Sequence, residues 1–461
     1  MAKINTIDCG SGTSTEPILY GTSELEKTDC LATPKPSEAP PSDGLATQHN
    51  ETGQQPGVPV DDSPNELIVQ LARSLHTGGA PAYELEQRME QAAQTLGVPA
   101  HFFSTPTSLF VTFEKETAFT RLIRVWPSET NLAKLAGLYD LYSNIEDGTL
   151  DVKQAWARLK EIESANYDYG TVTNIICYGV VGAGVGVFLG GNLTVVCVAG
   201  VISLIVGILV RSSEWLKLPG HLTNVLVGFV ATILANFSHV FLPDGNVELT
   251  LLAGLVILLP GLQVTVSVNE LATQNLASGT ARMAGAMTTF LTMIFGVVMG
   301  YGMADWLFLP QEANDLEPLG IAWSIAALLP IALTFCVLFR ARIRDVPWIL
   351  LSTSIAFGTV KVGGIYLGPL AATWTAALAV GLFSNVFAKW RNRPAAIMLM
   401  PGLLLLVPGS LGFFGMSEIM IHDDMAGGVK IVSTMLLIAV SIVAGLLISN
   451  AILPIDRRQK R

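Results

Sequence analysis

Cysteine is scarce in this chain of 461 residues, which holds only five. Two of them precede residue 31, and the other three, Cys177, Cys197 and Cys336, lie in apolar runs. A disulfide framework or a structural zinc site needs cysteines at short, paired spacings, which this sequence does not have. We therefore expect neither of these features, and no metal or other cofactor.

Charge is also sparse, at 14% of residues, and positive charge is the rarer sign. The stretch before residue 166 has 12 Lys and Arg against 23 Asp and Glu, whereas the rest has 15 against 14 over nearly 300 residues. A protein that binds nucleic acid needs a basic face. The acidic balance therefore argues against a nucleic-acid partner.

Several motifs of catalysis and targeting are missing as well. The sequence has no Walker A motif, which argues against coupling to ATP. It also has no GxSxG elbow and no Cys-His pair, so Ser74, His76 and Glu84 fit polar positions on helices better than a hydrolase site. The first residues, MAKINTIDCGSGTSTEP, contain no apolar core, which predicts that they are not a signal peptide.

The first 165 residues divide into two regions. Residues 1–62 are rich in Ser, Thr, Pro and Gly and show no apolar period, which predicts a disordered tail. Residues 63–165 have the pattern of a small α+β domain. We expect helices from 63 to 77 and from 80 to 96, strands at 99–104, 107–113 and 120–126, and helices at 129–146 and 150–164.

Long apolar runs begin near Asn174. A membrane-spanning helix needs about 20 consecutive apolar residues. By this criterion the chain has ten spans, in two membrane halves of five at 166–305 and 306–461. The expected spans are 171–190, 192–210, 220–241, 249–267, 283–304, 320–339, 346–365, 368–388, 395–413 and 428–453.

The loops indicate an orientation. Lys and Arg concentrate in cytoplasmic loops of membrane proteins, and placing the N-terminus in the cytoplasm puts most of these cations on that side. The opposite loops, LPDGNVE, ADWLFLPQEANDLEPLG and SEIMIHDDMAG, contain no Lys or Arg. We expect both termini in the cytoplasm and the protein in a plasma or vacuolar membrane. The inner cations are Arg211, Lys217, Arg282, Arg340, Arg342, Arg344, Lys389, Arg391, Arg393, Arg457, Arg458, Lys460 and Arg461.

Five spans per half is an odd number, so two related halves enter the membrane in opposite directions, which predicts a 5+5 inverted repeat. Pro260-Gly261 interrupts a span of the first half, and we pair it with Pro401-Gly402 in the second. Pro408-Gly409 lies in the same interrupted segment. This pairing places Leu411 opposite Glu270, so the repeat is expected to be chemically asymmetric.

Interrupted helices free backbone N–H and C=O groups to bind polar solutes, so we place the substrate site at these breaks. Glu270 can hold a substrate ammonium or carry a proton. Arg282 and Lys430, each near the start of a helix, suit an anionic group. Three residues also have an alternative interpretation. Glu270 can be a surface carboxylate in a cytoplasmic loop, Arg282 a positively charged membrane anchor, and Lys361 a side chain that snorkels to the membrane surface. The candidate site residues are Gln263, Asn269, Glu270, Asn275, Arg282, Lys361, Gly402, Ser410 and Lys430.

Five segments together resemble the threonine/serine exporter family, including its fungal pheromone-regulated membrane protein branch. They are HTGGAPAYELEQRMEQAAQTLGV, TPTSLFVTF, TRLIRVWPSETNLAKL, NELATQNLASGTARMAGAM and LMPGLLLLVPGS. The resemblance implies a cytoplasmic N-terminal domain fused to ten spans, and export of small hydroxy amino acids. Some relatives split the membrane halves between chains and are linked to dicarboxylate export. The matching positions are Gly79, Ala80, Pro81, Glu86, Pro106, Thr107, Gly279, Arg282, Pro401, Gly402, Pro408 and Gly409.

We therefore expect a secondary transporter, not an enzyme, that exports threonine, serine or a similar small amino acid and is coupled to proton movement. A small dicarboxylate exporter and a membrane scaffold or signalling protein are the alternatives. A zwitterion needs charges of both signs in its site, whereas cations alone serve a dicarboxylate. The expected partners are the lipid bilayer and the small substrate. A second copy of the chain, in a homo-oligomer, is a further candidate partner.

Overall fold

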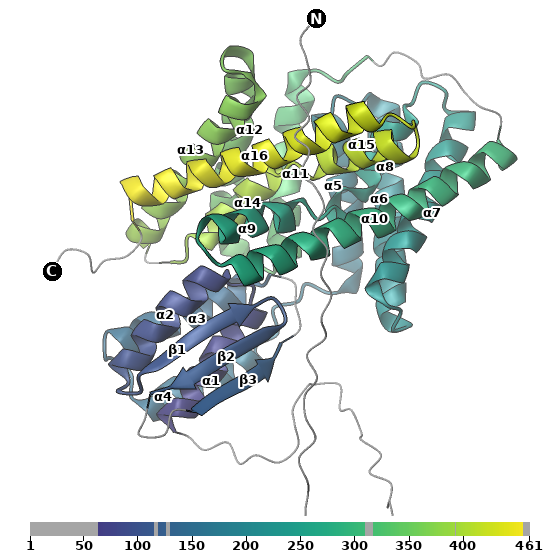
Figure 1. Cartoon of the computed structure of the whole chain (residues 1–461). Helices are drawn as coiled ribbons and strands as arrows, with labels where there is room; N and C mark the ends of the chain where they lie inside the picture. Colours follow the sequence, from purple (N-terminus) through teal and green to yellow (C-terminus); the bar gives the residue numbers. More distant parts are fainter. Residues whose placement is uncertain (1–62, 115–118, 126–129, 309–316, 392, 455–461) are drawn as a thin grey trace, which may run out of the picture. The chain divides into compact units, whose positions relative to one another are not determined.

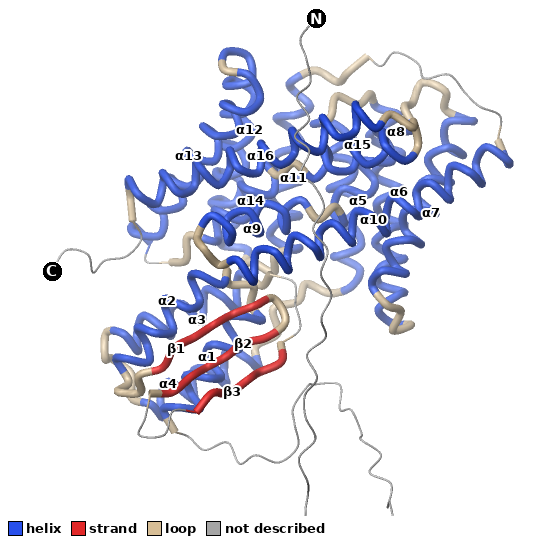
Figure 2. The backbone as a smooth tube through the Cα atoms, in the orientation of Figure 1, coloured by secondary structure: helices blue, strands red, loops and turns tan. Residues whose placement is uncertain are grey.

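A computed structural model describes residues 63–114, 119–125, 130–308, 317–391 and 393–454 (Figure 1). The tail expected at residues 1–62 lies outside the described residues, as do the C-terminal cations from Arg457 onward. Most of the described chain is helical, with one small sheet (Figure 2).

The N-terminal α+β part, residues 63–165, contains the three strands and four helices expected from its sequence pattern. The strands pair antiparallel in the order β1-β2-β3, and alternate residues of β2 are buried, as in a sheet with one covered face. Ser63 caps the first helix by accepting the Glu66 N–H. The elements are α1 (Pro64–Thr77), α2 (Ala82–Thr95), β1 (Ala100–Thr105), β2 (Ser108–Phe113), β3 (Phe119–Arg124), α3 (Leu132–Glu146) and α4 (Val152–Ser164).

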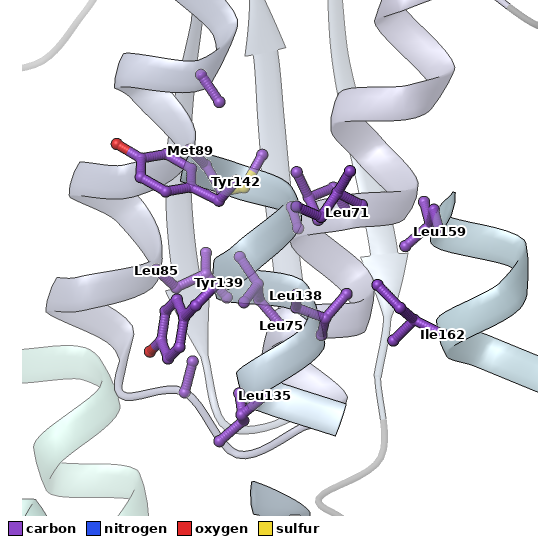
Figure 3. Close-up of a cluster of buried hydrophobic side chains, with 14 of the residues drawn as sticks. Leu71, Leu75, Leu85, Met89, Leu135, Leu138, Tyr139, Tyr142, Leu159 and Ile162 are labelled. Carbon is purple, nitrogen blue, oxygen red and sulfur yellow. The ribbon is translucent and has the colours of Figure 1, made fainter. Parts of the chain in front are cut away.

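The core of this part forms where the helices meet the covered face of the sheet. Figure 3 shows side chains from α1, α2, α3 and α4 pointing toward one another, among them Leu75, Leu85, Leu138 and Ile162. The buried side chains of β2 belong to the same cluster. Each fully buried leucine contributes roughly 1.5–3 kcal/mol. This packing holds in place the helices and strands that the turns of the N-terminal part connect.

The rest of the chain is a bundle of apolar helices. Among the described residues, nine helices are long and apolar enough to span a membrane, or ten if the bent pair formed by α8–η1 and α9 counts as one span. The expected number was ten. The elements are α5 (Thr171–Phe188), α6 (Leu193–Trp215), α7 (Gly220–Phe241), α8 (Val247–Leu255), η1 (Val256–Leu258), α9 (Gly261–Ala272), α10 (Leu276–Leu307), α11 (Ile321–Leu338), η2 (Ile343–Asp345), α12 (Val346–Tyr366), α13 (Gly368–Arg391), α14 (Ala396–Leu406), α15 (Gly409–Met420) and α16 (Met425–Ile452).

Glycines allow neighbouring spans to approach closely. A Cβ at Gly182 of α5 would lie 2.8 Å from the Ala199 carbonyl oxygen of α6, and one at Gly296 of α10 would lie 3.0 Å from the Val225 Cα of α7. Small residues at helix interfaces in membranes permit this backbone contact. The helices of each pair therefore pack almost backbone to backbone.

Two breaks with the same geometry interrupt the bundle. Leu259 and Val407 are extended, with ψ of 123° and 131°, because each precedes a proline. The helices on either side of the first break bend by 56°. A Cβ at Gly261 would collide with the Val407 side chain and lie 2.8 Å from the Gly409 Cα. The two breaks therefore lie against each other.

This geometry corrects the sequence pairing of the breaks. Pro401 lies inside α14, and the second break comes at Pro408-Gly409. A proline side chain is compatible with a kinked helix as well as with a break, so the Pro-Gly pair alone was ambiguous. Pro260 and Pro408 are 148 positions apart, as are Gly279 and Gly427. Adding this spacing to position 270 gives Glu418, whereas the spacing between Pro260 and Pro401 gives Leu411.

Candidate functional site

A cavity of about 560 Å³ lies where the N-terminal part meets the first break. Its walls come from the turns of the N-terminal part, from the ends of α8–η1 and α9, and from α5, α6, α10, α11 and α14. The wall includes His76, Gly79, Ala80, Pro81, Ala82, Ser104, Pro106, Thr130, Asp168, Arg211, Glu214, Leu258, Leu259, Pro260, Gln263, Arg282 and Arg340.

Arg282 is the cation of this cavity nearest in sequence to the first break, and a buried carboxylate holds it. Its Nε donates to Glu270 Oε2 at 3.1 Å and its Nη2 to Glu270 Oε1 at 3.0 Å. Ser278 Oγ donates to the same carboxylate at 2.9 Å. The Glu270 side chain is 0% exposed, while that of Arg282 is 27% exposed. A two-pronged contact of this kind fixes the plane of the guanidinium.

This geometry changes the role expected for Glu270. The carboxylate accepts three hydrogen bonds, is fully buried, and does not belong to the cavity wall. It therefore orients Arg282, and a substrate ammonium cannot reach it without separating the pair. Arg282 itself lies in the second turn of α10, which begins at Leu276, and not at the first residue of the helix.

At the first break, the C-terminal end of α8–η1 and the N-terminal end of α9 both border the cavity. Leu258 and Leu259, at the carboxyl end of α8–η1, line it, and so does Gln263 in the first turn of α9. Carbonyls at a helix C-terminus carry partial negative charge, and N–H groups at a helix N-terminus carry partial positive charge. One small molecule can therefore contact dipoles of both signs here.

The remaining charges of the wall are paired. Arg211 Nη1 lies 2.6 Å from Glu214 Oε2, and Arg340 Nε lies 2.6 Å from Asp168 Oδ1. Each pair is partly exposed, so water screens it and its net stabilisation is small. Gln263, in the first turn of α9, and Arg282 on α10, held by Glu270, are the polar wall side chains that we consider for substrate binding.

The N-terminal part contacts α9 through Tyr83 and Asn269, whose side chains are hydrogen-bonded. Burial raises the pKa of the Tyr83 hydroxyl, and Glu84 adds to the rise. Asn269 was expected to bind substrate, and in this structure its side chain bonds the N-terminal part instead.

A second contact joins α3 to the end of α11. The N–H groups of Leu132 and Ala133 donate to the carbonyls of Phe339 and Arg340, at 2.9 and 3.2 Å. The first N–H groups of a helix and the last carbonyls of another have no partner within their own helix. Each end satisfies the other, and this fixes the N-terminal part on the bundle.

The predicted site residues divide into three groups. Gln263, Arg282 and the hinge residue Pro260 lie in the cavity wall. Asn269 and Glu270 lie on α9, Asn275 occupies the N-cap position of α10, and none of the three belongs to the wall. Outside the wall are Lys361, whose ammonium lies 5.7 Å from the Phe357 ring, Gly402, Ser410 and the exposed Lys430.

Gly402 has a packing role. A Cβ there would collide with Ser352 Oγ and lie 2.7 Å from Val380 Cγ1. The absence of a side chain therefore lets α14 approach α12 and α13.

Sequence reasoning missed the contribution of the N-terminal part to the cavity. His76, Ser104 and Thr130 line it, and the His76 Nε2 lies 2.7 Å from the Thr105 carbonyl oxygen. Burial is the main cause that lowers the pKa of the His76 imidazole. The family segments containing Gly79 to Pro81 and Pro106 were a signal, but they gave no indication that these turns face the break.

Two family models match this chain, and both describe threonine/serine exporters. Residues 66–304 match the ThrE family model of threonine/serine exporters, and residues 324–452 match a second model described as "Threonine/Serine exporter, ThrE". No solved structure matches the chain.

Three curated relatives show the breadth of the similarity. The threonine/serine exporter of Corynebacterium glutamicum is 25% identical over 72% of this chain and 70% of its own length. Pheromone-regulated membrane protein 10 of Yarrowia lipolytica is 24% identical over 76% of this chain, and that of Kluyveromyces lactis is 22% identical over 83%. The chain spans 30% and 43% of the length of these two fungal relatives.

The first family model covers more than half of the chain, the second covers most of the remainder, and the described residues contain the apolar helices of a multi-pass membrane protein. This chain belongs to the threonine/serine exporter family.

Proposed function

We propose that this chain is a secondary transporter that moves small zwitterionic amino acids, such as threonine or serine, through the cavity at the first break. The observation that carries this proposal is the meeting of two helix ends of opposite polarity and one oriented arginine in a single cavity. The family of the chain and its relative from Corynebacterium glutamicum support the same substrate class.

Each charged group of such a substrate has a counterpart in the cavity. The substrate carboxylate binds the outer edge of the Arg282 guanidinium and the N–H groups at the start of α9. The ammonium binds the carbonyls that end η1 near Leu258. Glu270 is a positioning residue, since its carboxylate sets the plane of Arg282 from behind.

The arrangement of the helices supports alternating access. The elements α5–α10 recur as α11–α16 with start positions 148 to 153 residues apart, and the breaks at Pro260 and Pro408 have matching backbone angles. We interpret the two sets as a 5+5 inverted repeat with cytoplasmic termini, in which rocking of one half against the other opens the cavity to each side in turn. An imposed proton gradient is the proposed driving force.

Counterflow in proteoliposomes tests this proposal. Vesicles loaded with unlabelled threonine should accumulate labelled threonine when they contain the full chain. Arg282→Gln should lower kcat/KM by roughly 10- to 100-fold, because a hydrogen bond to a charged group contributes about 1.5–3 kcal/mol. Arg158→Gln, on the exposed face of α4, is the matched control and should transport normally.

Two outcomes would replace this function. Absence of exchange for every amino acid and dicarboxylate would favour a membrane scaffold. Uptake of succinate but not threonine would favour a dicarboxylate exporter, and one observation supports that alternative. The carboxylates near the described cavity, Glu270, Glu214 and Asp168, are all engaged by arginines. Accumulation under a pH gradient, and its loss with a protonophore, tests proton coupling.

A further inference from the structure

The cavity has two chemically different walls. The membrane helices supply the helix ends, Gln263 and Arg282. The ion pairs Arg211–Glu214 and Arg340–Asp168 come from the ends of these helices and the segments next to them. The residues that the N-terminal part contributes are small or uncharged. They are His76, Gly79, Ala80, Pro81, Ala82, Ser104, Pro106 and Thr130. Burial lowers the pKa of His76, which is therefore neutral at pH 7.

Two turns and Thr130 form this uncharged wall, and polar contacts hold the two turns together. One turn joins α1 to α2 and the other joins β1 to β2. Glu86 of α2 accepts the Ser104 N–H at 2.6 Å, and His76 of α1 contacts the Thr105 carbonyl at 2.7 Å. Burial raises the pKa of the Glu86 carboxyl, so this contact forms at an electrostatic cost. These two polar contacts fix the distance between the two turns.

The first turn is also fixed by its backbone. Gly79 has a φ of +92°, a conformation that residues with a side chain rarely adopt. A Cβ there would lie 3.0 Å from Thr130 Oγ1, which belongs to the same wall. The wall therefore has a defined shape.

Arg282 and the uncharged wall lie close to each other. The charges of Arg282 and Glu270 both act on the His76 imidazole. β1, which ends in the second turn, contacts α10, the helix that carries Arg282. A molecule whose carboxylate binds Arg282 is therefore close to the two turns.

We propose that the N-terminal part forms the side-chain subsite of the transporter, and that Ala80 and Pro106 are specificity-determining residues that limit the substrate to small side chains. The membrane helices bind the carboxylate and ammonium, which are common to all amino acids. The turns of the N-terminal part contact the group that differs among them. This subsite presupposes the transport activity proposed above.

Two substitutions alter the wall in opposite directions. Pro106→Ala enlarges it and should raise kcat/KM for leucine relative to threonine by roughly tenfold, the lower end of what one methylene contributes in a closed pocket. Ala80→Leu fills it and should lower threonine transport by a similar factor while glycine transport is retained. The controls are Pro99→Ala and Ala157→Leu, at exposed positions of the same part outside the cavity.

The readout is competitive counterflow of threonine, glycine and leucine in proteoliposomes containing the full chain. Unchanged relative rates in both wall variants, alongside normal wild-type transport, would overturn the subsite and leave the proposed function standing. A wild-type chain that transports no amino acid would overturn both. Retained glycine transport shows that Ala80→Leu is folded.

A chemical measurement covers the case in which Ala80→Leu does not fold. Pro106→Cys, in a background with serine at Cys9, Cys30 and Cys197, should react with a water-soluble maleimide, and millimolar threonine should slow this reaction severalfold. The two cysteines left in place, Cys177 and Cys336, are buried. Equal labelling with and without threonine would contradict the subsite, and Pro99→Cys should be labelled equally in both conditions.

Discussion

Replacement of Glu270 by glutamine should destabilise this protein by about 3 kcal/mol. Breaking a buried ion pair by removing one partner costs roughly 3–5 kcal/mol, because the other charge is left without compensation. The Glu270 carboxylate is 0% exposed, but the Arg282 side chain is 27% exposed. Water can therefore hydrate part of the abandoned guanidinium, which places the expected cost at the lower end of the range.

The variant should also lose transport, for the same geometric reason. Glutamine presents one acceptor oxygen where the carboxylate presents two, so it cannot hold both Nε and Nη2 of Arg282. The guanidinium then has no fixed plane at the cavity wall. We expect loss of both threonine and dicarboxylate counterflow, whereas a Glu270 that bound the ammonium directly would be needed for threonine alone.

A double-mutant cycle separates the pair from its surroundings. Arg282→Gln combined with Glu270→Gln removes both charges, so the double variant should be less destabilised than the sum of the single variants by about 1–3 kcal/mol. Apparent melting temperatures of detergent-purified protein give the ranking. Arg158→Gln and Glu161→Gln, an exposed pair on α4, form the control cycle, for which a coupling of about 0–1 kcal/mol is expected.

Two results would refute the positioning role of Glu270. One is that the effects of Glu270→Gln and Arg282→Gln on the melting temperature simply add, and the other is that Glu270→Gln has the melting temperature and transport of the wild type.

Three further changes have defined outcomes. Acidification below about pH 6.5 should lower the melting temperature, since the unfolded His76 binds a proton there while the folded imidazole, with its lowered pKa, does not; His76→Gln should flatten this dependence. Gly261→Ala should cost about 1–3 kcal/mol and impair counterflow, because its Cβ would collide at the contact between the breaks, whereas Gly285→Ala, where a Cβ meets open space, should not. Asp345→Asn should cost roughly 3 kcal/mol by leaving Arg393 without its 2% exposed partner, and Asp345→Asn/Arg393→Gln should recover part of the loss in melting temperature.

The bundle and the sheet could be predicted from sequence because each depends on a local pattern. A span requires about 20 apolar residues, and the described helices lie where such runs occur. The three strands follow from short alternating segments, and each begins and ends within two residues of the expected range. In both cases the local pattern of apolar residues is sufficient to predict the type of element, because that pattern reflects which residues are buried.

The site was less predictable because it depends on contacts between distant segments. Ala80 and Pro106 line the same cavity as Pro260 and Arg282, and no local pattern links them. The Glu270–Arg282 pair spans 12 positions, which is not a helical spacing. It forms because the chain reverses between α9 and α10 at Gln274, whose φ is +67°. An apolar pattern does not reveal such a turn.

The mistaken pairing of the breaks shows how local identity misleads in membrane helices. Pro401-Gly402 and Pro408-Gly409 have the same two residues, yet α14 continues through the first and ends before the second. The contact of Gly261 with Gly409 distinguishes them, since only the backbone at that position meets its counterpart. A spacing of 148 residues, the one that separates Pro260 from Pro408, leads from Glu270 to Glu418. The surroundings of these residues differ, because Glu270 is buried against Arg282 while Glu418 is only half-buried and Lys430 is exposed.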